Sequence, residues 1–211
     1  MSFNFADAPI PIRTEIQEAM RKEWAFLAAP GTWWSGEERV QIAAEARRAM
    51  AGERSGGELP AAVAGVVRTV AADSPLISAE WVEGLAAKGV DMPAYAEIIG
   101  VLARLSAVDM FHRALGLPLE PLPDPEPGEP LRTPPPTDLV FGKSFVPMAL
   151  MVSIPQTVSL VPPETVAWQE LSDAMYMTLA EMGEPDFRQG LHRTQMELVA
   201  ARTSQINECF Y

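Results

Sequence analysis

The stretch Thr194–Tyr211 reads TQMELVAARTSQINECFY and begins with the pattern of a helix N-terminus. Thr194 and Glu197 have the spacing of a capping box, in which two side chains satisfy the free backbone N–H groups of the first turn. Asn207 tolerates the left-handed conformation that often ends a helix. The pattern therefore predicts a helix spanning approximately Gln195–Ile206. Its predicted inner face consists of Met196, Val199, Ala200, Thr203 and Ile206.

Helical periodicity extends through most of the remaining sequence, and no segment shows the two-residue alternation of a strand. Further capping boxes are predicted at Thr14 with Gln17 and at Ser35 with Glu38. Other predicted helices begin at Pro60, at Ser78 with an end at Gly89, at Pro93 with an end at Gly116, and at Pro162–Pro163 with an end at Gly183. The sequence therefore predicts an all-α fold.

Nine prolines stand between Pro118 and Pro136, among acidic and small residues. Such a stretch cannot sustain a helix or a central strand. We expect an extended segment, partly polyproline II, that wraps a surface or spaces two units. This predicts a first helical unit over residues 1–117, a connector over 118–137 and the start of a second unit over 138–211. Residues 138–155 fit an irregular helical segment or a short strand.

Composition limits the classes of partner. The net charge of −12 should repel nucleic acid backbones and anionic membranes, so neither is an expected partner. We find no apolar stretch long enough to span a membrane and no secretory signal. A single cysteine cannot form an internal disulfide, which favours a reducing compartment, most simply the cytoplasm. Two lone histidines with one cysteine do not make a metal site, and no cofactor is expected.

The terminal stretch places Glu197 before Arg202, Ser204, Asn207 and Cys209. This order resembles the alkylhydroperoxidase D-like / carboxymuconolactone decarboxylase superfamily, where a Glu and an Arg-x-Ser-x-x-Asn run lead into Cys-x-x-Cys and a histidine four residues later. In this sequence the motif stops after Cys-x-x, so its second cysteine and its histidine have no counterpart.

The first half of the chain resembles a complete repeat of the same family. The stretch WVEGLAAKGVDMPAYAEIIGVLARLSAVDMFHRALGLPLEP, which starts at Trp81, is similar to the family's short and long helices. Where the family has its cysteines, residues 53–58 read ERSGGE. The resemblance therefore implies two related units, the first without redox cysteines and the second truncated.

By resemblance, the expected function is thiol-dependent reduction of hydrogen peroxide or an organic hydroperoxide. Cys209 would be one of the two redox cysteines and Glu197 would belong to a proton relay. A small dithiol protein would supply electrons, and the chain would form a homo-oligomer. Two alternatives stay open: a lactone decarboxylase or isomerase of the carboxymuconolactone branch, and a non-catalytic helical assembly module or remnant.

Each of these residues also has a purely structural interpretation. Glu197 can serve only as the capping residue of its helix. Cys209 can be a small, inert, half-buried side chain. His112 lies near the end of a long predicted helix, where its expected role is to interact with the C-terminal dipole.

The proposed chemistry constrains the local geometry. If Glu197 and Cys209 belonged to one straight helix, they would lie about 18 Å apart, too far for direct proton transfer. A reactive Cys209 therefore requires the helix to end near Asn207, with the next helix beginning at the cysteine. The positive end of that helix would then favour the thiolate.

Overall fold

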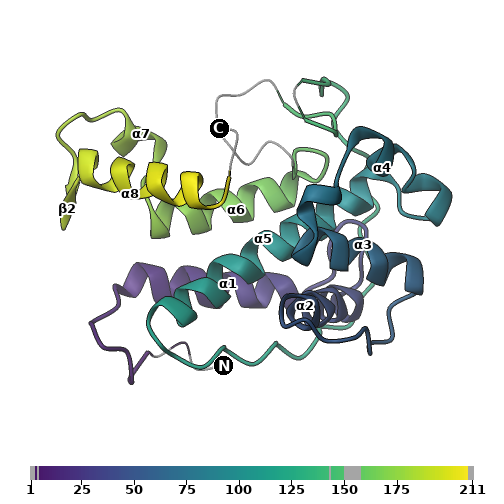
Figure 1. Ribbon diagram of the computed structural model, residues 1–211, viewed down its shortest axis with the longest axis horizontal. Helices are drawn as coiled ribbons and strands as arrows, with labels where there is room; N and C mark the ends of the chain where they lie inside the picture. Colours follow the sequence, from purple (N-terminus) through teal and green to yellow (C-terminus); the bar gives the residue numbers. More distant parts are fainter. Residues whose placement is uncertain (1–2, 4, 143, 150–157, 209–211) are drawn as a thin grey trace. The chain divides into compact units, whose positions relative to one another are not determined.

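The computed structural model describes Phe3 and residues 5–142, 144–149 and 158–208, and the all-α prediction is confirmed for this part of the chain (Figure 1). Contacts divide the chain into a first unit, Met1–Leu171, and a second, Ser172–Tyr211. The helices that begin in the first unit are α1 (Thr14–Ala28), α2 (Gly36–Met50), α3 (Ala61–Ala72), α4 (Ala79–Glu83), α5 (Met92–Ala114) and α6 (Pro162–Met175), with short 3-10 turns at Ser74–Leu76 and Ala86–Lys88.

Local capping explains where α2 begins, whereas α1 begins without a side-chain cap. The capping box predicted at Ser35 and Glu38 is confirmed: each side chain binds the other residue's backbone N–H, at 3.2 and 2.8 Å. The prediction of a capping box at Thr14 and Gln17 is wrong. Helix α1 begins at Thr14 with Arg13 as an N-cap that makes no side-chain capping bond, and Gln17 Nε2 instead donates to the Ile12 carbonyl at 3.0 Å.

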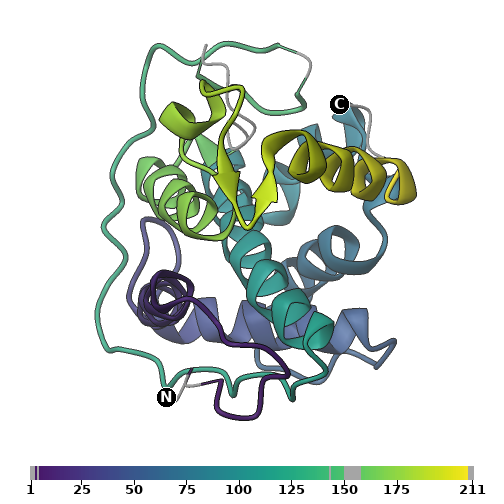
Figure 2. The same cartoon turned by 90° about the vertical axis from the view of Figure 1, so that its left-hand side faces the viewer.

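Helix α5 forms the core of the first unit. The Asp91 side chain accepts from the backbone N–H of Ala94 at its start, and Pro93 stands in the first turn. Gly116, with a φ of 69°, follows its end, as the sequence predicts. Helix α5 contacts α1, α2 and α3, and α2 packs against α3 (Figures 1 and 2). Most residues of α5 are buried, because neighbouring helices surround it.

Residues 117–136 contain no regular secondary structure and run along one side of the first unit (Figure 2). We call them the proline strap. The Trp24 indole donates to the Pro121 carbonyl at 2.8 Å, and the backbone N–H groups of Glu126 and Arg132 donate to the carbonyls of Ala28 and Thr32 at 2.8 Å. The strap thus binds helix α1 and the α1–α2 loop, while its role as a connector between two units stays a prediction.

The strap and the segment after it both lie inside the first contact unit, whose boundary falls at Leu171. The predicted boundaries at residues 117 and 137 do not coincide with that division. After the strap, Val140 and Met148 form an isolated antiparallel bridge. That residues 138–211 represent a second repeat stays a prediction.

The second unit contains the end of α6, helix α7 (Leu179–Met182), strands β1 (Arg188–Gln189) and β2 (Leu191–His192), and helix α8 (Arg193–Ile206). The prediction of one helix from Pro162 to Gly183 is wrong. Helix α6 ends at Met175, because Thr178 and Glu181 form a capping box that starts α7. The two short strands pair around Gly190, whose φ of 77° permits the tight turn.

Among the described residues, no helix has both the length and the apolar character that a membrane crossing requires.

Candidate functional site

The C-terminal motif is only partly visible, since Cys209 lies outside the described residues. Glu197 lies on α8, and its side chain is about half exposed, at 49%. Its carboxylate lies 3.6 Å from the Arg193 guanidinium, one helical turn away. It also accepts a hydrogen bond from the Tyr176 hydroxyl. Burial raises the pKa of Tyr176 above its ordinary value, and the neighbouring Glu197 carboxylate raises it further.

The structure corrects the predicted start of α8. The helix begins at Arg193, and its N-cap is His192, not Thr194. The His192 backbone N–H donates to Gln195 Oε1 at 2.9 Å, while the His192 Nδ1 accepts from the Thr194 backbone N–H at 3.2 Å. Glu197 therefore takes no part in this capping box, and its Tyr176 and Arg193 contacts define its surroundings.

The end of α8 agrees with the prediction, although the residue that turns the chain differs. The last helical residue is Ile206 and the C-cap is Asn207. Asn207 has a φ of −87°, and Glu208 is the residue that adopts the left-handed conformation, at 55°. From Glu197, in the second turn of α8, to Ile206, its last residue, the helix rises about 13.5 Å.

The predicted inner face of α8 is largely wrong. Met196 and Ala200 are half-buried, but Thr203 is exposed, and Val199 and Ile206 are 59% and 65% exposed. No residue of α8 is buried. The helix therefore presents apolar side chains to solvent along much of its length.

Sequence reasoning missed a network of five charged side chains buried inside the first unit. Arg39 Nη1 donates to Glu97 Oε1 at 2.5 Å and to Glu164 Oε1 at 2.8 Å. Arg104 Nε donates to Glu23 Oε2 at 2.9 Å, and its Nη2 donates to Glu164 Oε2. Glu164 thus joins both guanidinium groups, and all five side chains are at most 2% exposed.

The charges of this network do not balance, because three carboxyl groups face two guanidinium groups. Burial raises the pKa of Glu23 and of Glu97, and the arginines only partly offset it. For Glu164, burial is also the largest influence, but Arg104 and Arg39 together outweigh it and lower the pKa. Because the pKa values of Glu23 and Glu97 are raised in the folded protein, these two carboxyl groups stabilise the fold below pH 4.5. That stabilisation is lost as the pH rises through their pKa values in the folded protein.

Two glycines make room for the network. A Cβ atom on Gly31 would lie 2.8 Å from Glu97 Cδ, and one on Gly100 would lie 2.8 Å from Glu164 Cδ, both inside van der Waals contact. The aromatic ring of Phe26 lies close to both guanidinium groups, with its centroid 4.8 Å from Arg39 Cζ and 4.7 Å from Arg104 Cζ. These contacts hold the five charges in one arrangement.

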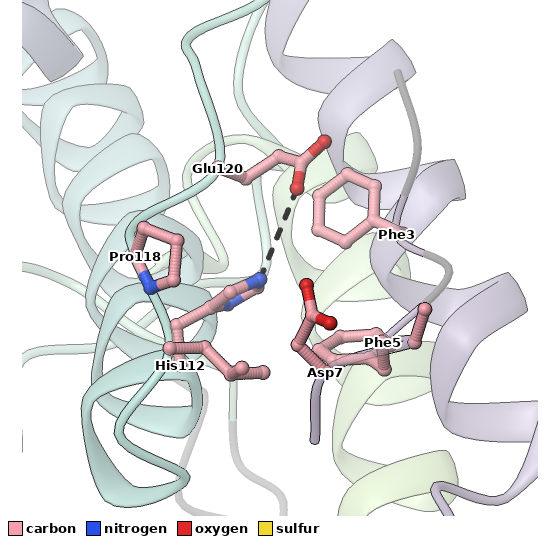
Figure 3. A pocket seen from close by; sticks show the side chains of 8 residues that line it. Phe3, Phe5, Asp7, His112, Pro118 and Glu120 are labelled. Atoms are coloured by element: carbon pink, nitrogen blue, oxygen red, sulfur yellow. Dashed lines mark ion pairs between the residues drawn. The ribbon is translucent and has the colours of Figure 1, made fainter.

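A separate pocket of about 130 Å³ opens at the end of α5 (Figure 3). Its walls are formed by the N-terminal segment, by His112 and by the first part of the proline strap; the lining residues are Phe3, Phe5, Ala6, Asp7, His112, Leu117, Pro118 and Glu120. His112 is 4% exposed, and its Nε2 lies 3.9 Å from Glu120 Oε2. Its Nδ1 lies 2.9 Å from the Val108 carbonyl, within α5, and its ring faces the pocket. That His112 interacts with the dipole at the helix end stays a prediction.

No described group of three or more histidine, cysteine or carboxylate side chains has the arrangement of a metal site. Comparison with family models finds no match, and comparisons with curated proteins and with solved structures find no similar chain.

Proposed function

We propose that this chain carries one redox cysteine of a thiol-dependent peroxidase, at Cys209. The observation that supports the proposal best is the end of α8 at Ile206, followed by the left-handed Glu208. Helix α8 thus ends three positions before Cys209 in the sequence, and the proposed chemistry requires such an end. A thiol beyond the helix can become the first residue of a following helix, where free N–H groups favour the thiolate.

The reaction follows from thiolate chemistry. The Cys209 thiolate attacks one peroxide oxygen, the O–O bond breaks, and an alcohol or water leaves with a proton while the sulfur becomes a sulfenic acid. A second cysteine then condenses with the sulfenic acid, releasing water and forming a disulfide, which a small dithiol protein reduces. Glu197 would return a proton to the leaving oxygen.

Peroxide turnover tests the proposal. The 211-residue chain, given a hydroperoxide and excess dithiol, should oxidise without sustained turnover, because it has one cysteine. A chain extended by a cysteine directly after Tyr211 and a histidine four residues later should turn over. Cys209→Ser in the extended chain is the control and should abolish activity. Sustained turnover by the 211-residue chain, or by the control, would show that the proposed pair of cysteines is not the site.

A second function, assembly of copies of this chain, is favoured by a different observation. In the second unit Leu198, Val199 and Ile206 are 70%, 59% and 65% exposed. Apolar side chains gathered on one helix favour a protein partner over solvent. We propose that they mediate a homo-oligomer.

Light scattering across a concentration series tests assembly. The chain should form an oligomer, and Leu198→Glu should convert it to a monomer because a charge would be buried in the contact. Leu131→Glu is a matched control, since that side chain is 69% exposed on the proline strap. A monomeric chain at every concentration, or a Leu198→Glu variant as large as the unsubstituted protein, would rule this function out.

A further inference from the structure

The three carboxyl groups of the buried network differ in the number of donors that bind them. Glu164 accepts from both guanidinium groups, one at each oxygen. Glu97 accepts from one guanidinium group at 2.5 Å and from the Trp33 backbone N–H at 2.7 Å. Among the described residues, Glu23 accepts only from Arg104 Nε, at 2.9 Å. Hydrogen bonds from N–H groups favour the ionised form of a carboxyl group, so Glu23 receives the least stabilisation as a carboxylate.

The charged groups that face Glu23 are more negative than positive. In the described part of the chain it pairs with one cation, Arg104 on α5. Burial is the largest cause of its raised pKa, Arg104 partly offsets this effect, and repulsion by Glu164 and Glu170, both on α6, adds to it. Lys22, the preceding residue, pairs with Glu170. A carboxylate at position 23 would therefore have to share its one cation with Glu164.

The charge count of the network leads to the same residue. Arg39, on α2, binds Glu97 and Glu164, and Arg104 binds Glu164 again, so two carboxylates already balance two guanidinium groups. A third carboxylate would be an uncompensated charge among side chains that are at most 2% exposed, and a group in such surroundings takes up a proton instead. As a neutral acid, Glu23 keeps its hydrogen bond, because its carbonyl oxygen still accepts from Arg104.

We propose that Glu23 holds a proton at pH 7 and forms a pH-sensitive latch between α1 and α6. While the proton is bound, the network is neutral and joins Glu23 on α1 to Glu164 on α6 through Arg104. When the proton leaves to solvent, Glu23 becomes a carboxylate that faces Glu164 and Glu170, and repulsion weakens the attachment of α6. All of these groups lie in the first unit, so the latch does not depend on the peroxidase function.

Carbon-13 nuclear magnetic resonance of the glutamate side chains tests where the proton resides. Each carboxyl carbon can be assigned through the bonds of its own residue, and its signal shifts when the group ionises. In the unsubstituted chain at pH 7, the Glu23 signal should have the position of a neutral acid and should move only as the pH rises further. The Glu97 and Glu164 signals should have the positions of carboxylates. An ionised Glu23 at pH 7, or a proton on Glu97 instead, would overturn the proposal.

Hydrogen exchange of the α6 backbone amides, expressed as protection relative to the unfolded chain at each pH, measures the latch itself. Opening of α6 frees Glu23 to ionise, so protection should fall about tenfold per pH unit above pH 7 until Glu23 also ionises in the folded state. Glu23→Gln cannot ionise, so its α6 protection should be independent of pH over that range. The Gln amide keeps the acceptor oxygen for Arg104.

Glu45→Gln is the matched control. Glu45 is also buried, but it pairs with Arg48 on α2 and Arg68 on α3, so this variant should keep the tenfold dependence in α6. The same pH dependence in Glu23→Gln as in the unsubstituted protein would show that Glu23 is not the latch. If Glu23→Gln does not fold, the unsubstituted chain decides, because α6 protection that stays constant above pH 7 would contradict the proposal.

Discussion

Replacing Glu164 with Gln is expected to lower the free energy of unfolding by about 3–5 kcal/mol, the range for removing one partner of a buried ion pair. Glu164 accepts hydrogen bonds from Arg39 and Arg104 through its two oxygens. The Gln amide can accept through its oxygen only, and its NH₂ group must face one of the guanidinium donors. Two buried positive charges would then retain only Glu23 and Glu97 as counter-charges.

Urea unfolding measures this effect, and Glu170→Gln is the control on the same helix. Glu170 pairs with Lys22 at 2.5 Å, but their side chains are 44% and 63% exposed, so we expect a change of at most about 1 kcal/mol. The arginines hold the pKa of Glu164 below 4.5 in the folded protein. Glu164 therefore stabilises the fold above pH 4.5, and this stabilisation is lost as the pH falls through its pKa in the folded protein. The difference between the unsubstituted protein and the Gln variant should therefore shrink in acid. Equal effects of the two substitutions would contradict the central role of Glu164.

Gly100→Ala is expected to destabilise the first unit by about 3 kcal/mol, the upper part of the range for overpacking a filled core. The new Cβ would overlap the Glu164 carboxylate, and that side chain cannot move away without breaking its contacts with Arg39 and Arg104. The usual gain from replacing a helical glycine with alanine, about 1 kcal/mol, is too small to compensate.

Gly65→Ala supplies the matched control for Gly100→Ala, and urea unfolding compares the two. Gly65 lies on helix α3, where a Cβ meets no atom within 4 Å, so this substitution should stabilise the protein by up to about 1 kcal/mol. Stabilisation by both substitutions would show that the carboxylate of Glu164 is free to move and that the buried network is not rigid.

The sequence predicted helices well where the determining signals were local. The box at Ser35 and Glu38 and the end at Gly116 depend on residues a few positions apart. The single helix predicted from Ser78 to Gly89 is wrong, because α4 ends at Glu83 and Gly89 follows a separate 3-10 turn, Ala86–Lys88. The same three-residue spacing was misleading at Thr194 and Glu197, because His192 and Gln195, two positions earlier, have the same spacing and form the observed cap. Several pairs with capping spacing can compete near one helix start, and pattern alone does not decide between them.

The buried network was not predictable from spacing, because its bonds join residues 58 to 125 positions apart. One signal was present: Arg39 stands three and four residues before the buried Ile42 and Ala43, a charged residue on an apolar helix face. The His112 pocket was unpredictable for the same reason, because His112 contacts Phe3 and Phe5, which are distant in the sequence, only in the folded chain. Of the predicted C-terminal site, the sequence located the end of α8 but not the surroundings of Glu197.

The reaction rate of Cys209 with a hydroperoxide tests the central claim most directly. The chain would be extended past Tyr211, with a serine in place of the second cysteine and a histidine four residues later. Without a second cysteine the sulfenic acid accumulates, so it can be trapped chemically and detected by mass spectrometry. We predict that Cys209 reacts about tenfold or more faster in the folded protein than in urea, since each unit by which the thiol pKa falls raises the thiolate fraction about tenfold. An equal or slower rate in the folded protein would show that the fold does not activate this thiol, and would contradict the proposed peroxidase function.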